Sequence, residues 1–353
     1  MKEFLCITPF MLPGNPLQDR FRLRNLDACV ARVSSGFPEA DHAVAVQVPP
    51  GSGLPPGLPA GPRYVAVEAE GAFRKTALMN RAVLGNPGYR AYVMVDADLY
   101  MTREIAGYAT ENAGNGRLVF PYGSTAYLDE PDTRRLVETG SPWPGEKDPG
   151  TPIWRQTGLC VAFTRDGFDR VGGFDACFSG WGAEDDAFVY KFRRAGMGVL
   201  RNPDGDAVAY HMFHPKANSA EYLSGKDYLR NRVYCACIRR MSDEDFSRYL
   251  AGEAALDSLV GKYSALGRLE TSLDWRISPT KTLHVDTTIY DIDREGGMTV
   301  GKVLGEVRRE DGDAGVVHFC DAVLYGIPDL PRGTREEIDR IYAESAARLE
   351  ART

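Results

Sequence analysis

Two acidic clusters carry residue types that could perform group-transfer chemistry. The first is the pair Asp96 and Asp98, which follows a run of apolar residues. The second is Glu-Asp-Asp at 184–186, preceded by Gly-Gly-Phe-Asp at 172–175 and Gly-Trp-Gly at 180–182. An acidic pair that can hold a divalent cation, together with a separate carboxylate that removes a proton, is the equipment for metal-assisted group transfer.

The elements that must position these acids alternate between apolar runs and segments with helical spacing. We expect strands at 4–10, 43–48, 64–67, 89–95, 117–120, 158–163, 199–201 and 207–210. We expect helices at 21–33, 73–84, 102–112, 164–171 and 185–195. This order predicts an α/β fold with a mainly parallel sheet flanked by helices. Ligands bind at the carboxyl ends of strands in such sheets, and Asp96 and Asp98 lie at that edge.

The remaining segments predict structure but carry few residues of a candidate site. Residues 129–152 are polar and rich in Pro and Gly, which predicts a long loop of the kind that often has a function. Later segments are expected to form helices at 220–240, 243–266 and 336–351, with strands across 283–319 and turns at 296–297 and 311–313. We therefore expect a first domain at 1–240, with a nucleotide half (1–100) and an acceptor half (101–240), and an α+β extension of unknown role at 241–353.

Composition excludes some classes of function. The chain has 353 residues and a net charge of −7, which argues against general nucleic-acid binding. Seven cysteines occur without CxxC spacing, mostly among apolar neighbours, which favours buried reduced thiols and a cytoplasmic location. The apolar start of the chain is short and contains Pro9, so it predicts a core strand and no signal peptide. No apolar run reaches the length of a membrane span.

The residues at 172–186 and Phe-Arg-Lys-Thr-Ala-Leu-Met-Asn at 73–80 resemble two motifs of one family. The pairing of Gly-Gly-Phe-Asp with Gly-Trp-Gly-x-Glu-Asp-Asp is the more distinctive, whereas Asp-x-Asp alone would most often be a solvated turn. Roughly residues 1–240 resemble the inverting glycosyltransferases of the GT-A fold, such as the β-1,4-galactosyltransferase C-terminal region and the bacterial chondroitin-polymerase-type domains.

This resemblance implies a divalent cation, Mn²⁺ or Mg²⁺, at the donor diphosphate. Asp98 corresponds to the direct ligand, and Asp96 to a residue that faces the ribose or a metal-bound water. A histidine after the second acidic cluster often completes the set, and here His211 matches that position. His214 is the competing choice, and packing of either histidine in a loop is the alternative.

The resemblance also assigns the base. The aspartate directly after the family's glutamate removes the proton of the acceptor hydroxyl, which places Asp185 in that role. An acid at a helix N-terminus is stabilised as the carboxylate, so simple capping is the competing interpretation, above all for Asp186. Glu184 and Asp186 are expected to face the acceptor, and Trp181 could stack on a sugar or anchor its loop.

Basic residues are expected beside the nucleotide. Arg74 or Lys75 corresponds to the family residue that faces the phosphates or uracil, and a solvated helix start is the alternative. Thr8 and Arg20 occupy the region where the family contacts the base and diphosphate, with Arg22 as a further candidate.

The expected function is transfer of a hexose or N-acetylhexosamine from a UDP-sugar to an acceptor hydroxyl. The acceptor would be a small molecule, a natural product or a glycan, and the chain could form a homodimer. One alternative is a non-catalytic sugar-nucleotide-binding module. A more remote one is a phosphohydrolase of the haloacid dehalogenase type, which also has Asp-x-Asp after a strand but normally after the first strand.

Overall fold

In the computed structural model the described residues are 2–114, 116–141, 157–180, 182–215 and 226–265, with strands at 272–277, 283–292, 298–308 and 316–320. The chain divides into two compact units, Met1–Lys216 and Ala217–Thr353. The division between the units lies before the helix expected at 220–240, which was predicted to end the first domain. The functional boundary at 240 stays a prediction.

The first unit is built on a seven-stranded sheet with the order β3-β2-β1-β4-β8-β6-β9. Its strands are β1 (Lys2–Met11), β2 (Asp41–Val48), β3 (Arg63–Glu68), β4 (Tyr89–Val95), β6 (Leu118–Phe120), β8 (Cys160–Thr164) and β9 (Val199–Arg201). β1 pairs in parallel with β2 and β4, and β2 with β3. β8 is antiparallel to both β4 and β6, and β6 is parallel to β9. The predicted α/β class with a mainly parallel sheet is confirmed.

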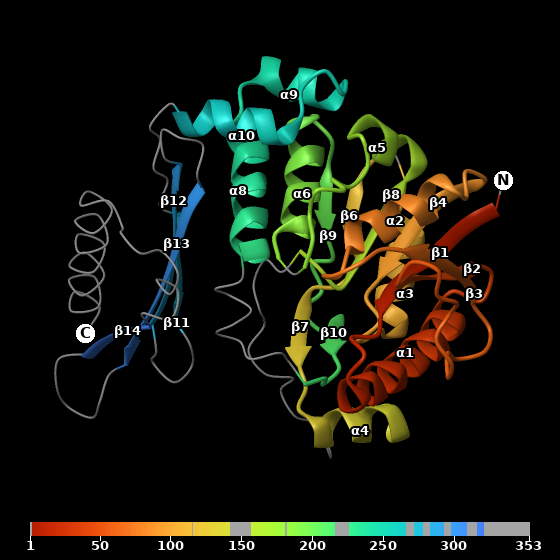
Figure 1. Ribbon diagram of the computed structural model, residues 1–353. Helices are drawn as coiled ribbons and strands as arrows, with labels where there is room; N and C mark the ends of the chain where they lie inside the picture. The colour runs from red at the N-terminus through yellow and green to blue at the C-terminus, as the bar shows by residue number, and fades with distance from the viewer. Residues whose placement is uncertain are drawn as a thin grey trace. The chain divides into compact units, whose positions relative to one another are not determined.

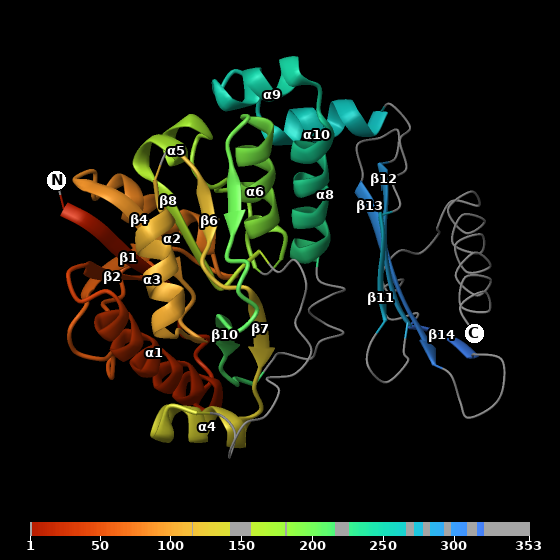
Figure 2. The same ribbon diagram turned by 180° about the vertical axis from the view of Figure 1, so that it is seen from behind.

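The helices of this unit cover both faces of the sheet (Figures 1 and 2). Those beside the seven-stranded sheet are α1 (Pro16–Gly36), α2 (Lys75–Leu84), α3 (Arg103–Asn112), α5 (Arg165–Arg170) and α6 (Glu184–Arg194). Side chains alternate along β2, so that Val44 and Val46 pack in one buried cluster with Leu26 of α1. The intervening Ala43 belongs to the main cluster with Leu78 of α2. Burial on both faces therefore explains why this strand is apolar throughout.

One element was wrongly predicted as loop. Within the expected loop 129–152, the chain forms α4 (Glu130–Thr139). The Asp129 side chain accepts a hydrogen bond from Asp132 N at 2.8 Å, a proline lies in the first turn, and Gly140 ends the helix at a φ of 79°. These are the ordinary start and stop signals of a helix, and they outweigh the polar composition on which the loop prediction rested.

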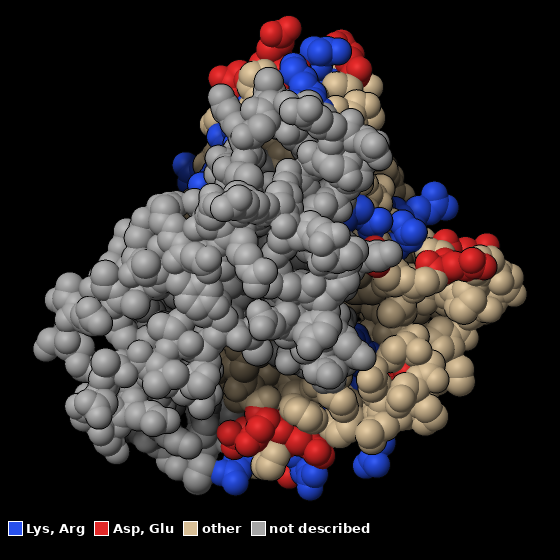
Figure 3. Space-filling model, turned by 60° about the vertical axis from the view of Figure 1, so that its left-hand side comes forward, with Lys and Arg blue, Asp and Glu red and all other residues tan. Residues whose placement is uncertain are grey.

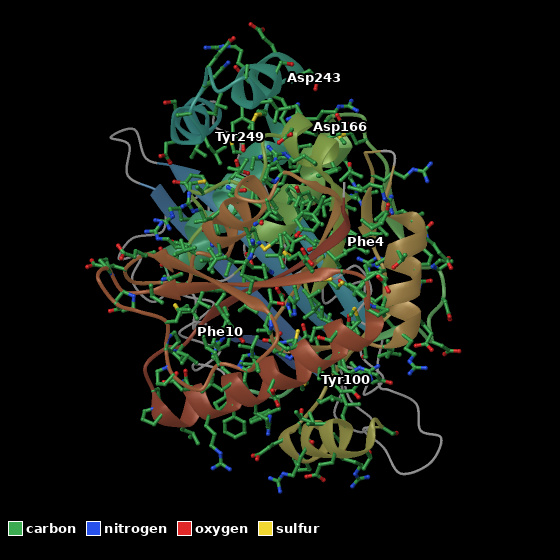
Figure 4. All side chains as sticks on the ribbon, turned by 90° about the vertical axis from the view of Figure 1, so that its right-hand side faces the viewer. Phe4, Phe10, Tyr100, Asp166, Asp243 and Tyr249 are labelled. Carbon is green, nitrogen blue, oxygen red and sulfur yellow. The ribbon has the colours of Figure 1, made fainter. Side chains whose placement is uncertain are left out.

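A small second sheet was not predicted, although one of its strands was expected at 207–210 and is β10. It has the order β5-β10-β7, from Leu99–Tyr100, Val208–His211 and Ser124–Tyr127. β5 and β10 run antiparallel, which places His211 opposite Leu99, immediately after the acidic pair. Tyr100 of β5 lies beside α1 (Figure 4), where the Arg32 guanidinium covers its ring at 4.8 Å. The two strands that were missed, β5 and β7, are too short for a period to be recognised in the sequence.

The second unit contains helices followed by an antiparallel sheet. Its helices are α8 (Lys226–Arg240), α9 (Asp243–Leu250) and α10 (Leu256–Ala265), and its strands are β11 (Ser272–Ile277), β12 (Leu283–Ile292), β13 (Met298–Arg308) and β14 (Val316–Cys320). The prediction of a single helix at 243–266 is wrong, because the helix is interrupted at Gly252, which has a φ of 73°. The turns predicted at 296–297 and 311–313 and the helix at 336–351 lie outside the described residues.

Surface and core agree with the composition. Figure 3 shows acidic and basic side chains interspersed over the described part of one face. Cys6, Cys29 and Cys160 are free thiols buried in the core, and burial raises the pKa of each. Within the part of the chain that the structure describes, no helix combines the length and apolar character needed to cross a bilayer. The cytoplasmic location stays a prediction.

Candidate functional site

The site is organised around the turn that follows β4. Leu99 N donates to Asp96 O at 3.0 Å, which closes a tight turn over residues 96–99. The turn is fixed from two sides, because Asp96 N donates to Leu159 O and Met212 N donates to Asp98 O, each at 2.8 Å. The two carboxylates contact different groups: Asp96 meets Lys75, whereas Asp98 meets two histidines.

Asp98, His211 and His214 form a group with metal-ligand geometry, which we call the metal group. Asp98 Oδ2 lies 3.1 Å from His214 Nε2 and 3.7 Å from His211 Nε2. One ligand atom from each residue falls within 4.8 Å of the others. Burial alone would raise the pKa of Asp98, but His211, His214 and the more distant Arg22 stabilise its carboxylate and lower the pKa below the usual range. The structure thus brings together both histidines between which the sequence left the choice open.

A second group, which we call the acid cluster, surrounds Lys75 at the start of α2. Lys75 Nζ lies 2.9 Å from Asp185 Oδ2 and 3.0 Å from Asp96 Oδ1, and its side chain is 9% exposed. Glu184 is the third acid of the cluster and adds to the negative field at Lys75. The neighbouring Arg74 is exposed. Of the two basic residues that were candidates for contact with the nucleotide, Lys75 is therefore the one that lies in the site.

Burial and charge act in opposite directions in the acid cluster. Burial would lower the pKa of Lys75, but Asp185, Asp96 and Glu184 raise it well above its ordinary value, so the amine is charged. For Asp185, burial together with Glu184 and Asp96 outweighs Lys75 and raises the pKa to about 8. Burial also raises the pKa of Glu184, and its Oε2 finds no hydrogen-bond partner among the described residues. The cluster therefore holds a proton readily at neutral pH.

The wall of the acid cluster is the strained entry to β8. A Cβ atom built on Gly158 would lie 2.8 Å from Asp185 Oδ2, so any larger residue at this position would displace this carboxylate. Leu159 N donates to Asp96 Oδ2 at 3.2 Å, and the Tyr122 hydroxyl donates to Gly158 O at 2.7 Å. Leu159 and Ala183, each with a φ of 67°, are the non-glycine residues of positive φ within the described ranges. Both adjoin the acid cluster, and such strain concentrates at functional sites.

The Gly-Gly-Phe-Asp motif anchors the acidic helix through hydrogen bonds and an ion pair. Lys191 of α6 is buried, donates to Gly173 O at 2.8 Å and lies 3.3 Å from Asp175 Oδ1. Asn80 at the other side donates to Phe174 O at 2.7 Å and accepts from Phe174 N at 2.9 Å. These contacts join α2, the motif and α6, which explains why the two family motifs occur together.

The other predicted site residues take varied positions. The Thr8 side chain is fully buried and hydrogen-bonds His42 Nε2 at 3.0 Å. Arg20 is exposed on α1. Asp186 accepts a hydrogen bond from the Thr157 hydroxyl at 2.5 Å. Trp181 lies outside the described residues.

Segments of the chain match known proteins. Residues 146–216 match the family model described as the N-terminal domain of galactosyltransferase. Over 78 residues the chain is 38% identical to the chondroitin synthase of Escherichia coli, a match that covers 22% of this chain and 11% of that protein. Over these segments the chain is similar to the galactosyltransferase family and to chondroitin synthase, of which it spans only about a tenth of the length. The resemblance stated from the motifs is confirmed.

Solved structures that resemble the chain at low sequence identity include two glycosyltransferases. The catalytic domain of Drosophila β1,4-galactosyltransferase 7 in complex with xylobiose is 13% identical, with a TM-score of 0.42, over 80% of this chain and 91% of that chain. GalNAc-T7 with UDP, GalNAc and Mn²⁺ is 13% identical, with a TM-score of 0.42, over 91% of this chain and 72% of that chain.

Proposed function

We propose that this chain is a metal-dependent inverting glycosyltransferase that moves a hexose or N-acetylhexosamine from a UDP-sugar to an acceptor hydroxyl. The observation that carries the proposal is the turn after β4, whose two carboxylates join two separate groups. Asp98 belongs to the metal group, and Asp96 connects through Lys75 to Asp185. A cation site and a base are therefore neighbours at the ligand-binding edge of the sheet.

The donor atoms of the metal group fit Mn²⁺ best. Carboxylate oxygens suit Mn²⁺ and Mg²⁺ alike, whereas imidazole nitrogens bind first-row transition metals more readily than Mg²⁺. Asp98, His211 and His214 would hold the ion, which when bound supplies positive charge for the diphosphate leaving group.

Asp185 is the proposed base. Its carboxylate takes the proton of the acceptor hydroxyl while the acceptor oxygen forms a bond to the anomeric carbon of the donor. The bond from that carbon to UDP breaks, and UDP leaves with the electron pair, which inverts the anomeric configuration. Lys75 holds the Asp185 carboxylate at 2.9 Å and so fixes the direction in which it faces. A buried carboxylate with a raised pKa is suited to accept a proton near neutral pH.

The remaining assignments rest on the sequence. Thr8, Arg20, Arg74 and Trp181 as donor contacts, and Trp181, Glu184 and Asp186 as acceptor contacts, stay predictions. A small molecule, a natural product or a glycan as the acceptor, and a homodimer as the assembly, stay predictions as well. The buried Oε2 of Glu184, which has no hydrogen-bond partner among the described residues, supports its place in the site, because such atoms in native structures usually have a catalytic role or bind water or an ion.

The test is a screen of UDP-sugars with Mn²⁺, which detects slow donor hydrolysis by the release of UDP and needs no acceptor. The wild-type chain should hydrolyse one donor or a few when Mn²⁺ is present. Asp98→Ala should no longer be activated by Mn²⁺. Binding of UDP and Mn²⁺ without turnover on any donor or acceptor would favour the binding module instead. Phosphate release from a simple phosphomonoester would favour the phosphohydrolase.

A further inference from the structure

The segment between the two histidines of the metal group is held by side chains from distant elements. Residues 212 and 213 separate His211 from His214, so their backbone sets how the two imidazoles approach Asp98. Met212 N already donates to Asp98 O at 2.8 Å, which ties the segment to the third member of the group. The polar groups of Phe213 are satisfied elsewhere.

Phe213 is gripped at both its amide and its carbonyl. Its N–H donates to the Thr133 hydroxyl of α4 at 2.8 Å. Its carbonyl accepts from Asn25 Nδ2 at 3.0 Å and from Arg24 Nη2 at 3.1 Å, both on α1. Asn25 Oδ1 in turn accepts from Arg24 Nη2 at 3.1 Å, so that the amide is fixed in orientation. We call Thr133, Asn25 and Arg24 the Phe213 clamp.

The clamp is buried and specific. Thr133 is 0% exposed and Asn25 is 1% exposed, which is unusual for these residue types. The Phe213 ring packs edge-on against Phe21 of α1 with centroids 5.5 Å apart, so the side chain as well as the backbone is held. Burying polar side chains is costly unless they are hydrogen-bonded, and these side chains form their bonds to the two peptide units that flank Phe213, which rigidifies them.

From these contacts we propose that Thr133 and Asn25 are positioning residues for the divalent cation. They act through the backbone of Phe213 and hold His214 at the distance from Asp98 and His211 that a single ion requires. The proposal rests on the proposed function, because it takes the metal group as a cation site. Groups that orient ligands from outside the coordination sphere typically account for 10- to 100-fold in metal affinity.

The test measures Mn²⁺ affinity directly, by calorimetry on the full chain without donor or acceptor. Thr133→Val keeps the shape of the side chain and removes the acceptor for Phe213 N, so we expect affinity to fall about 10-fold. Asn25→Leu should cause a smaller loss, because Arg24 still donates to the Phe213 carbonyl. The double variant should fall further, toward about 100-fold. Thr133→Ser, which keeps the hydroxyl, should bind Mn²⁺ as the wild type does.

A matched control separates positioning from general stability. The Thr164 hydroxyl also accepts a backbone N–H, that of Gly167 at 3.1 Å, but it caps α5. Thr164→Val should lower the melting temperature and leave Mn²⁺ affinity unchanged. Wild-type affinity in folded Thr133→Val and Asn25→Leu would overturn this proposal alone. If the wild-type chain itself binds no Mn²⁺, the proposed metal site is refuted, and the proposed role of the clamp is refuted as well.

Discussion

Gly158 offers a sharp test of the proposed base, because alanine at this position would press on Asp185 and on little else. The added Cβ would lie 2.8 Å from Asp185 Oδ2, whereas ordinary contacts begin at 3.4 Å. The carboxylate must therefore move by about 0.6 Å, the difference between these distances. Gly158 is not among the residues of positive φ, so backbone strain does not contribute.

The size of the effect follows from that displacement. A misplacement of about 1 Å in a reacting group can cost about 100-fold in rate. For Gly158→Ala we expect kcat for sugar transfer to fall roughly 10- to 100-fold, because the carboxylate is displaced by less than about 1 Å. The ion pair with Lys75 limits how far the carboxylate can move. The assay is UDP release with Mn²⁺, the donor found by the hydrolysis screen and its acceptor. Mn²⁺ affinity should not change, since Asp98 and the histidines lie outside the contact.

Gly107→Ala is the matched control for this experiment. Gly107 lies in α3, and a Cβ there would meet no atom within 4 Å. Alanine should stabilise this helix by up to about 1 kcal/mol and leave turnover unchanged. If Gly158→Ala turned over at the wild-type rate, the carboxylate of Asp185 would not be the group that limits transfer, and its assignment as the base would be refuted.

Three further predictions concern the acid cluster and its anchor. Asp185→Asn should lower kcat about 10²- to 10⁴-fold while UDP and Mn²⁺ still bind, as measured by turnover and calorimetry. Because burial raises the pKa of Asp185 to about 8 and the base must be ionised, kcat/KM should rise with pH through about 8, whereas a profile flat from pH 6 to 9 would argue against this base. Lys191→Met should destabilise the first unit by about 3–5 kcal/mol in thermal unfolding, since it removes the buried cation 3.3 Å from the Asp175 carboxylate. Adding Asp175→Leu should restore much of that loss, and no recovery would mean that the pair is not the cause.

Much of the central sheet could be predicted because its signals are local. The buried strands are long runs of apolar residues, and their helices show clear spacing, so the edge at which Asp96 and Asp98 lie followed from topology rules alone. The prediction of α4 as loop failed although Asp129 and Gly140 mark its ends. Overall polarity was weighed above capping chemistry, and an exposed helix is polar on most of its surface.

The details of the site depended on contacts that no local pattern carries. Whether Arg74 or Lys75 faces the acids is decided by the rotation of α2, which its tertiary packing sets. The sequence could not decide between His211 and His214 as the partner of Asp98. The structure places both beside Asp98, because β10 pairs with β5. The approach of Gly158 to Asp185 joins residues far apart in sequence, and a lone glycine gives no signal of such a contact.

The central claim is that one cation is held by Asp98 with His211 and His214, while Asp185 faces the donor from the acid cluster. A crystal grown with Mn²⁺ and UDP, measured at the manganese absorption edge, tests it most directly. We predict one anomalous peak in contact with Asp98, His211 and His214 and with the diphosphate, and Asp185 on the side where the sugar would lie. A peak elsewhere, or a diphosphate bound away from these residues, would contradict the account.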